Sequence, residues 1–423
     1  MKDLLHKLLL SILLFAFIYT FQLPGLPRGV LSYRVVLILL FVYAVFFKQN
    51  SSIGRTQISA EIVKGYVSWN VFLTIYVIMI LTVFGHAGVG SHESTNDYVN
   101  MVIVLPLFYY AGRRIFKSLD DFMWVMCAVG LIQSFIIIAG TMSPAINAAL
   151  TLINSDSSFA ENERMEYMMA SGYHLGFKCF TSLGSLQMAI SQIAAWYFIE
   201  RKNNLYAFLA FLVISFSSAL VSRTGLLIAV VCIVFVFLGN NKKSKKIIVL
   251  GSILSVLAVV LLNAMSVINI SEFVEVNFNR FKVLFEKGIY DSYLKVYLGN
   301  DSANKNYIPP ISIYTILGLG ITNGVSGTGI RVAADGAFLR NYAAMGLIVV
   351  TINYLLLYSF FRKIKKKSKL RFHRLLITLI GIVWFIGEFK EYFTYQIYFM
   401  CLAMLIFSSI ENCENKKREM TSV

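Results

Sequence analysis

Long apolar segments, each close to the length of a membrane-spanning helix, follow one another along most of the chain. A hydrocarbon core about 30 Å thick requires roughly 20 apolar residues per helix, and the peptide groups of such a segment have to be satisfied within the helix. The pattern therefore predicts an all-α polytopic membrane protein with about twelve transmembrane helices in a single integral membrane domain, residues 1–423. The predicted spans are residues 4–22, 30–47, 66–85, 98–111, 122–142, 179–199, 205–221, 224–239, 247–268, 336–360, 375–389 and 396–410.

Two of the predicted connections, residues 143–178 and 269–335, are much longer than a turn. Connections of this length in a compact protein are usually functional or disordered. The second connection, between spans nine and ten, carries Phe278, Phe281 and Phe285 at helical spacing. This spacing predicts an amphipathic helix that lies on the membrane surface.

The composition is typical of a membrane protein, and the distribution of positive charge predicts which segments lie on each side of the membrane. Hydrophobic residues make up 57% of the chain and charged residues 14%, which excludes an ordinary soluble domain. With the N-terminus in the cytoplasm, 25 of the 38 Lys and Arg residues fall on the cytoplasmic side and 11 on the outer side, while Arg34 and Arg340 lie within spans. The positive-inside rule then places both termini in the cytoplasm and both long connections outside. It also explains the net charge of +16 without nucleic acid as a partner.

One arginine stands out because its surroundings are so apolar. Arg223 is the only charged residue between positions 205 and 239, at the outer tip of a tight hairpin between spans seven and eight. One interpretation is that its side chain reaches the lipid headgroups. The other is that it faces a cavity and binds a phosphate through its two-pronged guanidinium. Arg280 in the outer loop and Arg340, one turn into span ten, fit a shared anion site on the same side.

The order of three short motifs gives a family resemblance. "SRTGLL" (222–227) is followed by a long outer loop carrying "LGLG" (317–320), and "DGAFLRNYAAMGLI" (335–348) opens the next span. In order and topology, from about residue 179 to 410, the chain resembles the O-antigen polymerase (Wzy) family and the related O-antigen ligase superfamily. The ligase branch typically carries a histidine where this chain has Asp335 and Gly336, and this difference favours a polymerase.

The resemblance implies a GT-C-like membrane glycosyltransferase in the bacterial inner membrane. Such an enzyme transfers a glycan from undecaprenyl diphosphate to a second lipid-linked repeat unit at the periplasmic face, and so builds an O-antigen or capsule-type polysaccharide. Its partners would be the undecaprenyl-diphosphate-linked oligosaccharide, membrane lipids and a chain-length regulator. No metal or other cofactor is expected, because arginines can stabilise the diphosphate leaving group and the outer loops contain no DxD motif.

The resemblance also implies roles for particular residues. Arg223 and Asp335 would be catalytic, with Asp335 as the base that takes the acceptor proton, although an Asp before a glycine is equally typical of a helix N-cap. His174 is the second choice of base, and an exposed polar loop residue is the simpler interpretation of it. The predicted substrate contacts are Arg280, Arg340, Arg331, Arg164 and His174.

Two other classes of function remain open. A flippase or transporter of lipid-linked oligosaccharides also suits twelve spans, but coupled transporters usually need acidic residues near the middle of the membrane. The predicted span cores contain none, and Glu388 and Glu391 fall with Lys390 at the outer end of span eleven. A sensor or scaffold without catalysis is the third possibility. An O-antigen ligase remains the alternative within the enzyme class.

Overall fold

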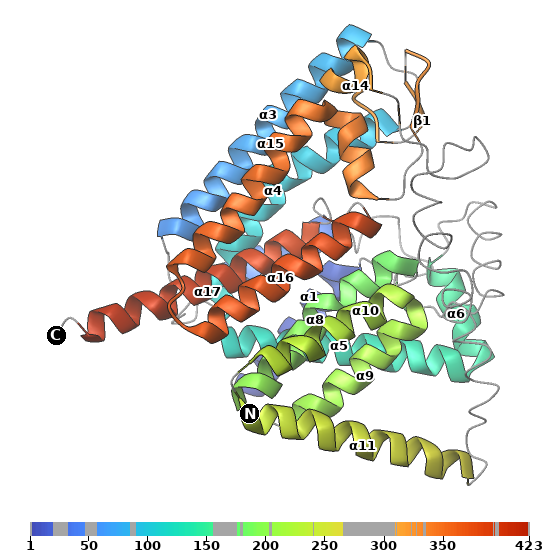
Figure 1. Cartoon of the computed structure of the whole chain (residues 1–423), viewed down its shortest axis with the longest axis vertical. Helices are drawn as coiled ribbons and strands as arrows, with labels where there is room; N and C mark the ends of the chain where they lie inside the picture. The colour runs from blue at the N-terminus through green and yellow to red at the C-terminus, as the bar shows by residue number, and fades with distance from the viewer. Residues whose placement is uncertain are drawn as a thin grey trace. The chain divides into compact units, whose positions relative to one another are not determined.

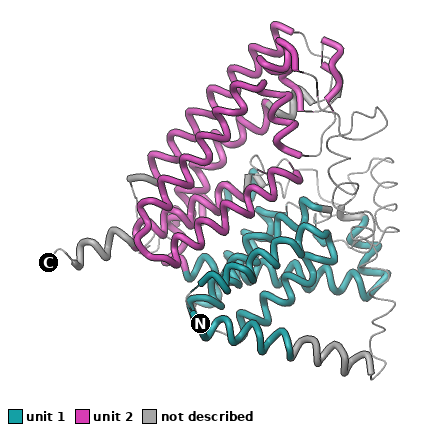
Figure 2. Tube along the Cα trace, viewed as in Figure 1, with its two compact units in different colours: residues 1–39, 120–286 teal, residues 40–119, 287–423 magenta. Residues whose placement is uncertain are grey.

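The computed structural model is almost entirely helical over the part of the chain that it describes. The described residues are 2–19, 33–46, 57–84, 90–154, 176–177, 181–202, 205–239, 241–264, 309, 311–322, 324–326, 328–332, 336–391, 393 and 397–421. They divide into two compact units, residues 1–39 with 120–286 and residues 40–119 with 287–423 (Figure 2). The boundary between the two units falls within helix α2 (Tyr33–Phe46).

Unit 1 is a helical bundle around one deeply buried helix. Its helices are α1 (Lys2–Tyr19), α5 (Leu119–Met142), α6 (Pro144–Asn154), α8 (Thr181–Lys202), α9 (Leu205–Val221), α10 (Arg223–Leu238) and α11 (Lys242–Ala264) (Figure 1). Helix α8 packs against both α9 and α10, and its residues from Leu186 to Ile199 are largely buried. Small residues permit the close approach of these helices. A Cβ atom added at Gly225 would lie 2.3 Å from Ser218 Oγ, and one at Gly130 2.4 Å from Ser191 Cβ.

Unit 2 contains long helices packed along one another and a small loop structure. Its elements are α3 (Gln57–Phe84), α4 (Gly90–Ile115), α14 (Ile313–Leu317), β1 (Gly324–Val325), β2 (Arg331–Val332), α15 (Ala337–Lys367), α16 (Arg371–Lys390) and α17 (Ile397–Thr421). Helix α3 packs against α4 and α15, and α4 packs against α17 (Figure 1). The two short strands form an antiparallel pair, in which Val325 lies opposite Arg331.

Helix α15 is broken at Gly346, and the break folds its first part back. Gly346 has φ 79° and ψ 165°, and a Cβ atom there would lie 2.4 Å from the carbonyl oxygen of Ile316, so this position requires glycine. The amide of Asn341 donates to the hydroxyl of Tyr354 at 2.7 Å. In a continuous helix, residues 13 positions apart would be separated by about 20 Å. Residues 337–345 are thus a short helix that turns back along the rest of α15.

Helices cover nearly all the described residues of the twelve segments that the apolar pattern predicts to be spans, which confirms the all-α class. The tenth differs in form, because residues 336–360 contain two helical pieces rather than one straight helix. The connection at 143–178 contains helix α6, and the connection at 269–335 contains α14 and the strand pair near its end. The predicted amphipathic helix around Phe281 lies outside the described residues.

Several helices have the length and composition of membrane spans. Among the described residues, four qualify on both counts: Ser59–Phe84, Leu119–Met142, Ala337–Lys367 and Arg371–Lys390. Shorter apolar helices cover Arg34–Phe46, Leu205–Val221, Arg223–Leu238 and Tyr398–Cys413. The fold is therefore that of an all-α protein suited to a membrane, while twelve crossings and the sides of the loops stay predictions.

Candidate functional site

Arg223 lies at the tip of the α9–α10 hairpin, as the sequence predicts. Helix α10 begins here because Ser222 is its N-cap: the backbone is extended at Ser222, and its hydroxyl accepts a hydrogen bond from the Thr224 N–H at 3.2 Å. Arg223 is the first helical residue after this cap and is partly buried. The turn between the two helices consists of Ser222 alone, so the backbone has little freedom at the arginine.

Buried hydroxyl groups of neighbouring helices hold this tip in place. The hydroxyls of Ser185 on α8 and Ser222 lie 2.6 Å apart, and Ser185 also donates to the carbonyl oxygen of Ser218 at 3.3 Å. One helical turn further down, the amide of Gln192 donates to the carbonyl oxygen of Gly225 at 3.2 Å. Buried polar groups in apolar surroundings are costly unless they are hydrogen bonded. These bonds therefore favour one position of the hairpin relative to α8.

A fourth helix, α5, joins the same polar layer. The hydroxyl of Ser217 on α9 donates to the hydroxyl of Ser134 on α5 at 2.7 Å, and both serines are fully buried. These serine and glutamine residues are not among the predicted site residues, because single polar residues in apolar helices are common. Their only signal in the sequence is that Ser134, Ser185, Gln192 and Ser217 interrupt otherwise apolar runs.

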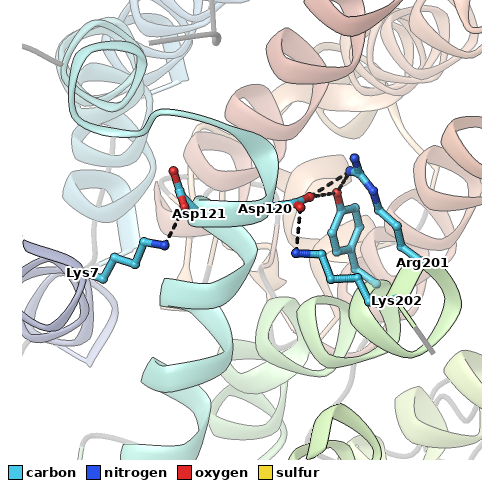
Figure 3. Close-up of polar contacts among 6 residues, drawn as sticks. Lys7, Asp120, Asp121, Arg201 and Lys202 are labelled. Carbon is cyan, nitrogen blue, oxygen red and sulfur yellow. Dashed lines mark hydrogen bonds and ion pairs between the residues drawn. The ribbon is translucent and has the colours of Figure 1, made fainter. Parts of the chain in front are cut away.

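The opposite end of unit 1 carries a cluster of charged residues. The carboxylate of Asp120, at the start of α5, pairs with Arg201 Nη1 at 2.8 Å and with Lys202 Nζ at 2.9 Å, both at the end of α8 (Figure 3). It also accepts a hydrogen bond from the Tyr197 hydroxyl at 2.5 Å. Next to it, Asp121 pairs with Lys7 of α1 at 2.7 Å (Figure 3).

The distance along α8 separates this cluster from the hairpin tip. Ser185, beside the tip, and Arg201, in the cluster, are 16 residues apart, which corresponds to about 24 Å of helix. Arg223 and the charged cluster thus occupy opposite ends of unit 1. The predicted topology requires this separation, since it assigns the cluster to the cytoplasmic side and Arg223 to the outer side.

Arg340 lies on the folded-back part of α15 in unit 2, where it is partly buried and its backbone N–H donates to the carbonyl oxygen of Gly336 at 3.2 Å. Its neighbour Asn341 begins a chain of buried polar groups. The Asn341 amide donates to the Tyr354 hydroxyl, which donates to Glu388 Oε2 at 2.8 Å. Glu388 is in the last turn of α16, as expected, but its side chain is fully buried rather than at a solvated end.

The start of α15 corrects one interpretation of Asp335. The N-cap of this helix is Gly336, and no side chain caps it, so Asp335 is not in the N-cap position. Gly336 begins the helix where its backbone packs against the end of α16: a Cβ atom at Gly336 would lie 2.8 Å from the carbonyl oxygen of Phe389. Close packing against α16 therefore accompanies the start of the helix here, in place of the expected side-chain cap.

The other predicted site residues are only partly covered. Arg331 is exposed on β2, in the same unit as Arg340. Arg164, His174, Arg280 and Asp335 lie outside the described residues. Arg223 belongs to unit 1 and the described outer arginines Arg331 and Arg340 to unit 2, so a shared site formed by them remains a prediction.

Two further observations concern the chemistry that the chain offers. Within the described ranges, no three His, Cys, Asp or Glu side chains are grouped so that they could hold a metal ion. Cys127, Cys232 and Cys401 are free thiols. The expectation of a metal-free mechanism stays a prediction.

No family model, no curated protein and no solved structure matches the chain.

Proposed function

We propose that this chain is a polysaccharide polymerase that joins repeat units carried on undecaprenyl diphosphate at the periplasmic face of the bacterial inner membrane. The product is an O-antigen or capsule-type polysaccharide. The proposal rests on the order of motifs in the sequence and on one structural observation. This observation is that Arg223, a permanent cation, is held by a hydrogen-bonded cap at the tip of an otherwise uncharged helical hairpin.

The proposed reaction requires a fixed cation beside the diphosphate leaving group, and Arg223 at the hairpin tip is the proposed cation. An acceptor sugar hydroxyl attacks the anomeric carbon of the donor glycan, the bond from that carbon to the phosphate oxygen breaks, and undecaprenyl diphosphate leaves with the bonding electrons. Negative charge then grows on the diphosphate. A guanidinium that is already positioned stabilises this charge with little reorganisation, and it does so more strongly where water is scarce. Arg340 and Arg280 are the further cations proposed for the same leaving group.

The proton of the acceptor hydroxyl needs a base, and Asp335 is the proposed one. Asp335 directly precedes Gly336, which begins the folded-back part of α15 that carries Arg340. The proposed base and one proposed cation therefore belong to one short segment of chain. His174 is the alternative base.

The test is polymer formation from purified lipid-linked repeat units by the purified protein, with EDTA present. Loss of one cation that stabilises the leaving group should slow the reaction about a hundred- to thousandfold, by analogy with the loss of one oxyanion-hole donor. Arg223→Ala should therefore make almost no polymer, and Arg223→Lys should recover little, because an ammonium cannot form the two-pronged contact. Lys242→Ala, which removes an exposed cation in the same unit, is the matched control and should retain full activity.

Other outcomes would contradict parts of the proposal. Full activity of Arg223→Ala removes this residue from the site. Activity that is lost in EDTA and restored by a divalent ion contradicts the metal-free mechanism. If Asp335→Asn works while Asp335→Ala does not, Asp335 acts as a hydrogen-bonding residue and not as a base, because the amide cannot take the proton at neutral pH.

Transport of lipid-linked oligosaccharide is the second candidate, and the buried Glu388 favours it. Ionisable residues buried in membrane proteins often lie on proton or ion pathways. A deletion strain separates the candidates by the products on a gel. Single repeat units attached to the final acceptor indicate a polymerase, unattached polymer indicates a ligase, and lipid-linked units retained in the cytoplasm indicate a flippase.

A further inference from the structure

A cationic pocket lies between α3 and α4 in unit 2. It has a volume of about 480 Å³. Its cations are Lys64 from α3 and Arg113 and Arg114 from the last turn of α4. The rings of Tyr109 and Tyr110 and the small apolar side chains of α3 complete its walls.

The two guanidinium groups are held by aromatic rings of their own helix. Arg113 lies over the Tyr109 ring at 5.2 Å, and Arg114 lies over the Tyr110 ring at 4.4 Å. Tyr109 is in turn held by α17, where its hydroxyl is within 3.3 Å of Ser408 Oγ. Ring contacts of this kind attract a guanidinium and restrict it while leaving its N–H groups available to an acceptor.

The pocket cations have no carboxylate of the described chain to neutralise them. No ion pair joins Lys64, Arg113 or Arg114 to an acidic side chain in the described part of unit 2, and the buried Nε of Arg113 has no hydrogen-bond acceptor there. A buried donor on a charged group is expensive to leave without an acceptor. A bound anion would supply that acceptor.

Two acidic side chains of unit 2, one on α3 and one on α17, pair with groups outside the pocket. Glu61, one turn before Lys64, pairs with Lys363 of α15 at 3.0 Å. Glu411 of α17 accepts hydrogen bonds from the backbone N–H and the hydroxyl of Ser59, at 2.9 Å and 2.8 Å. Both carboxylates thus have partners that do not line the pocket.

The surface next to the pocket indicates what kind of anion fits. Helix α3 has no charged residue between Lys64 and Phe84, a length of about 30 Å, which matches the hydrocarbon core of a bilayer. Along the face of Lys64, Val71, Ile75 and Ile78 are exposed at helical spacing. Helix α4 exposes Ile103 and Val99 on the face of Tyr110. Apolar stripes thus lead away from the cations on both helices.

From this arrangement we propose that the α3–α4 pocket binds the phosphate of an anionic phospholipid, whose acyl chains lie along the exposed stripes of the two helices. Guanidinium groups match the oxygens of a phosphodiester in charge and geometry. Basic pockets between membrane helices on the cytoplasmic side are known to bind acidic lipid headgroups, and the predicted topology puts this pocket on that side. This site does not depend on the proposed polymerase activity.

The experiment measures lipid binding to the purified full-length protein in detergent by native mass spectrometry. The probes are phosphatidylglycerol, phosphatidylcholine of the same acyl chains, and inorganic phosphate. We expect phosphatidylglycerol to bind in preference to phosphatidylcholine. Removing two pocket charges with Arg113→Gln/Arg114→Gln should weaken phosphatidylglycerol binding about thirtyfold, since each basic residue near an anionic lipid surface contributes about fivefold.

The matched control is Lys365→Gln/Lys366→Gln, which removes two exposed charges from the end of α15 that lies beside the start of α3. This control should bind phosphatidylglycerol like the parent protein. If both double variants lose phosphatidylglycerol binding equally, the lipid is attracted by the overall positive charge and the pocket is not its site. Unchanged binding in the arginine variant would also contradict the pocket as the site. If inorganic phosphate displaces phosphatidylglycerol at equal concentration, the ligand is a soluble phosphate compound, and the proposal of a phospholipid ligand is wrong. Lys64→Gln, at an exposed position, keeps the test valid if the arginine variant does not fold, and its expected loss is about fivefold.

Discussion

Asp120 is the residue of unit 1 whose replacement should test the packing of the bundle most directly. It joins α5 to α8 through three donors, at 2.5 Å from the Tyr197 hydroxyl, 2.8 Å from Arg201 and 2.9 Å from Lys202 (Figure 3). The side chains of Arg201 and Lys202 are 45% and 50% exposed, so each ion pair contributes only about 0.2–1 kcal/mol. The Tyr197 side chain is buried, and its hydrogen bond to a charged acceptor contributes about 1.5–3 kcal/mol.

Together these contributions predict that Asp120→Ala lowers the free energy of unfolding by about 2–5 kcal/mol. Asp120→Asn keeps an oxygen for the Tyr197 hydroxyl but loses the charge, and we expect a loss of about 1–2 kcal/mol. Asp121→Asn is the matched control. It removes the same charge from the same first turn of α5, so both variants lose the same favourable interaction with the helix dipole. Asp121 pairs with Lys7 at 2.7 Å, and the two side chains are only 20% and 21% exposed. Lys7 keeps Asp3 as a partner at 3.3 Å when Asp121 is replaced, so we expect the loss to stay below about 1 kcal/mol.

The assay is equilibrium unfolding in detergent, followed by the reaction of a thiol-specific dye with the buried Cys232 of the same unit. The reasoning fails if Asp121→Asn destabilises the protein as much as Asp120→Asn. A double-mutant cycle with Tyr197→Phe provides a second check. The losses from Asp120→Asn and Tyr197→Phe should not add, because both changes affect the same hydrogen bond.

Three further predictions concern topology, the break in α15 and the buried carboxylate. A reporter fused after Lys367 should report the cytoplasm and one near Asn304 the periplasm, because of the distribution of Lys and Arg; the same compartment for both would contradict the predicted topology. Gly346→Ala should destabilise the fold by more than about 1–2 kcal/mol, since a positive φ costs that much and the new methyl meets the backbone of α14. Gly381→Ala, whose Cβ has ordinary contacts, should be neutral; both are measured by unfolding followed at the buried Cys401 of their own unit. Glu388→Gln should leave polymer formation within about twofold of the parent, because the amide can keep the hydrogen bond from Tyr354. The same variant should abolish any proton-coupled transport, because an amide cannot change its protonation. Loss of polymer in this variant would make Glu388 part of the polymerase mechanism.

The sequence by itself determined where the long apolar helices are, while the short helices α6 and α14 lie in the predicted connections. The described parts of the twelve apolar segments are helical, because a long apolar segment satisfies its peptide groups most simply by internal hydrogen bonds. The apolar pattern also placed Arg223 between spans seven and eight, at a hairpin tip, and the structure has it there. At the start of α15 the N-cap interpretation of Asp335 was wrong. The helix begins one residue later than an Asp335 cap requires, where Gly336 packs closely against the end of α16.

The tertiary structure decided the arrangements that depend on residues far apart in the chain. Gly346 looks like any glycine in an apolar helix until α14 is packed against it, and only then does its positive φ break the helix and fold Arg340 back. Asp120 meets Arg201 across 81 residues, and Lys64 lines one pocket with Arg113 across 49, although none of these residues has a distinctive local pattern. Hydrophobic periodicity is a local property, and it specifies which segments are helices. Pairing between polar groups on different helices depends on how the helices pack, and the order of residues along each helix does not contain that information.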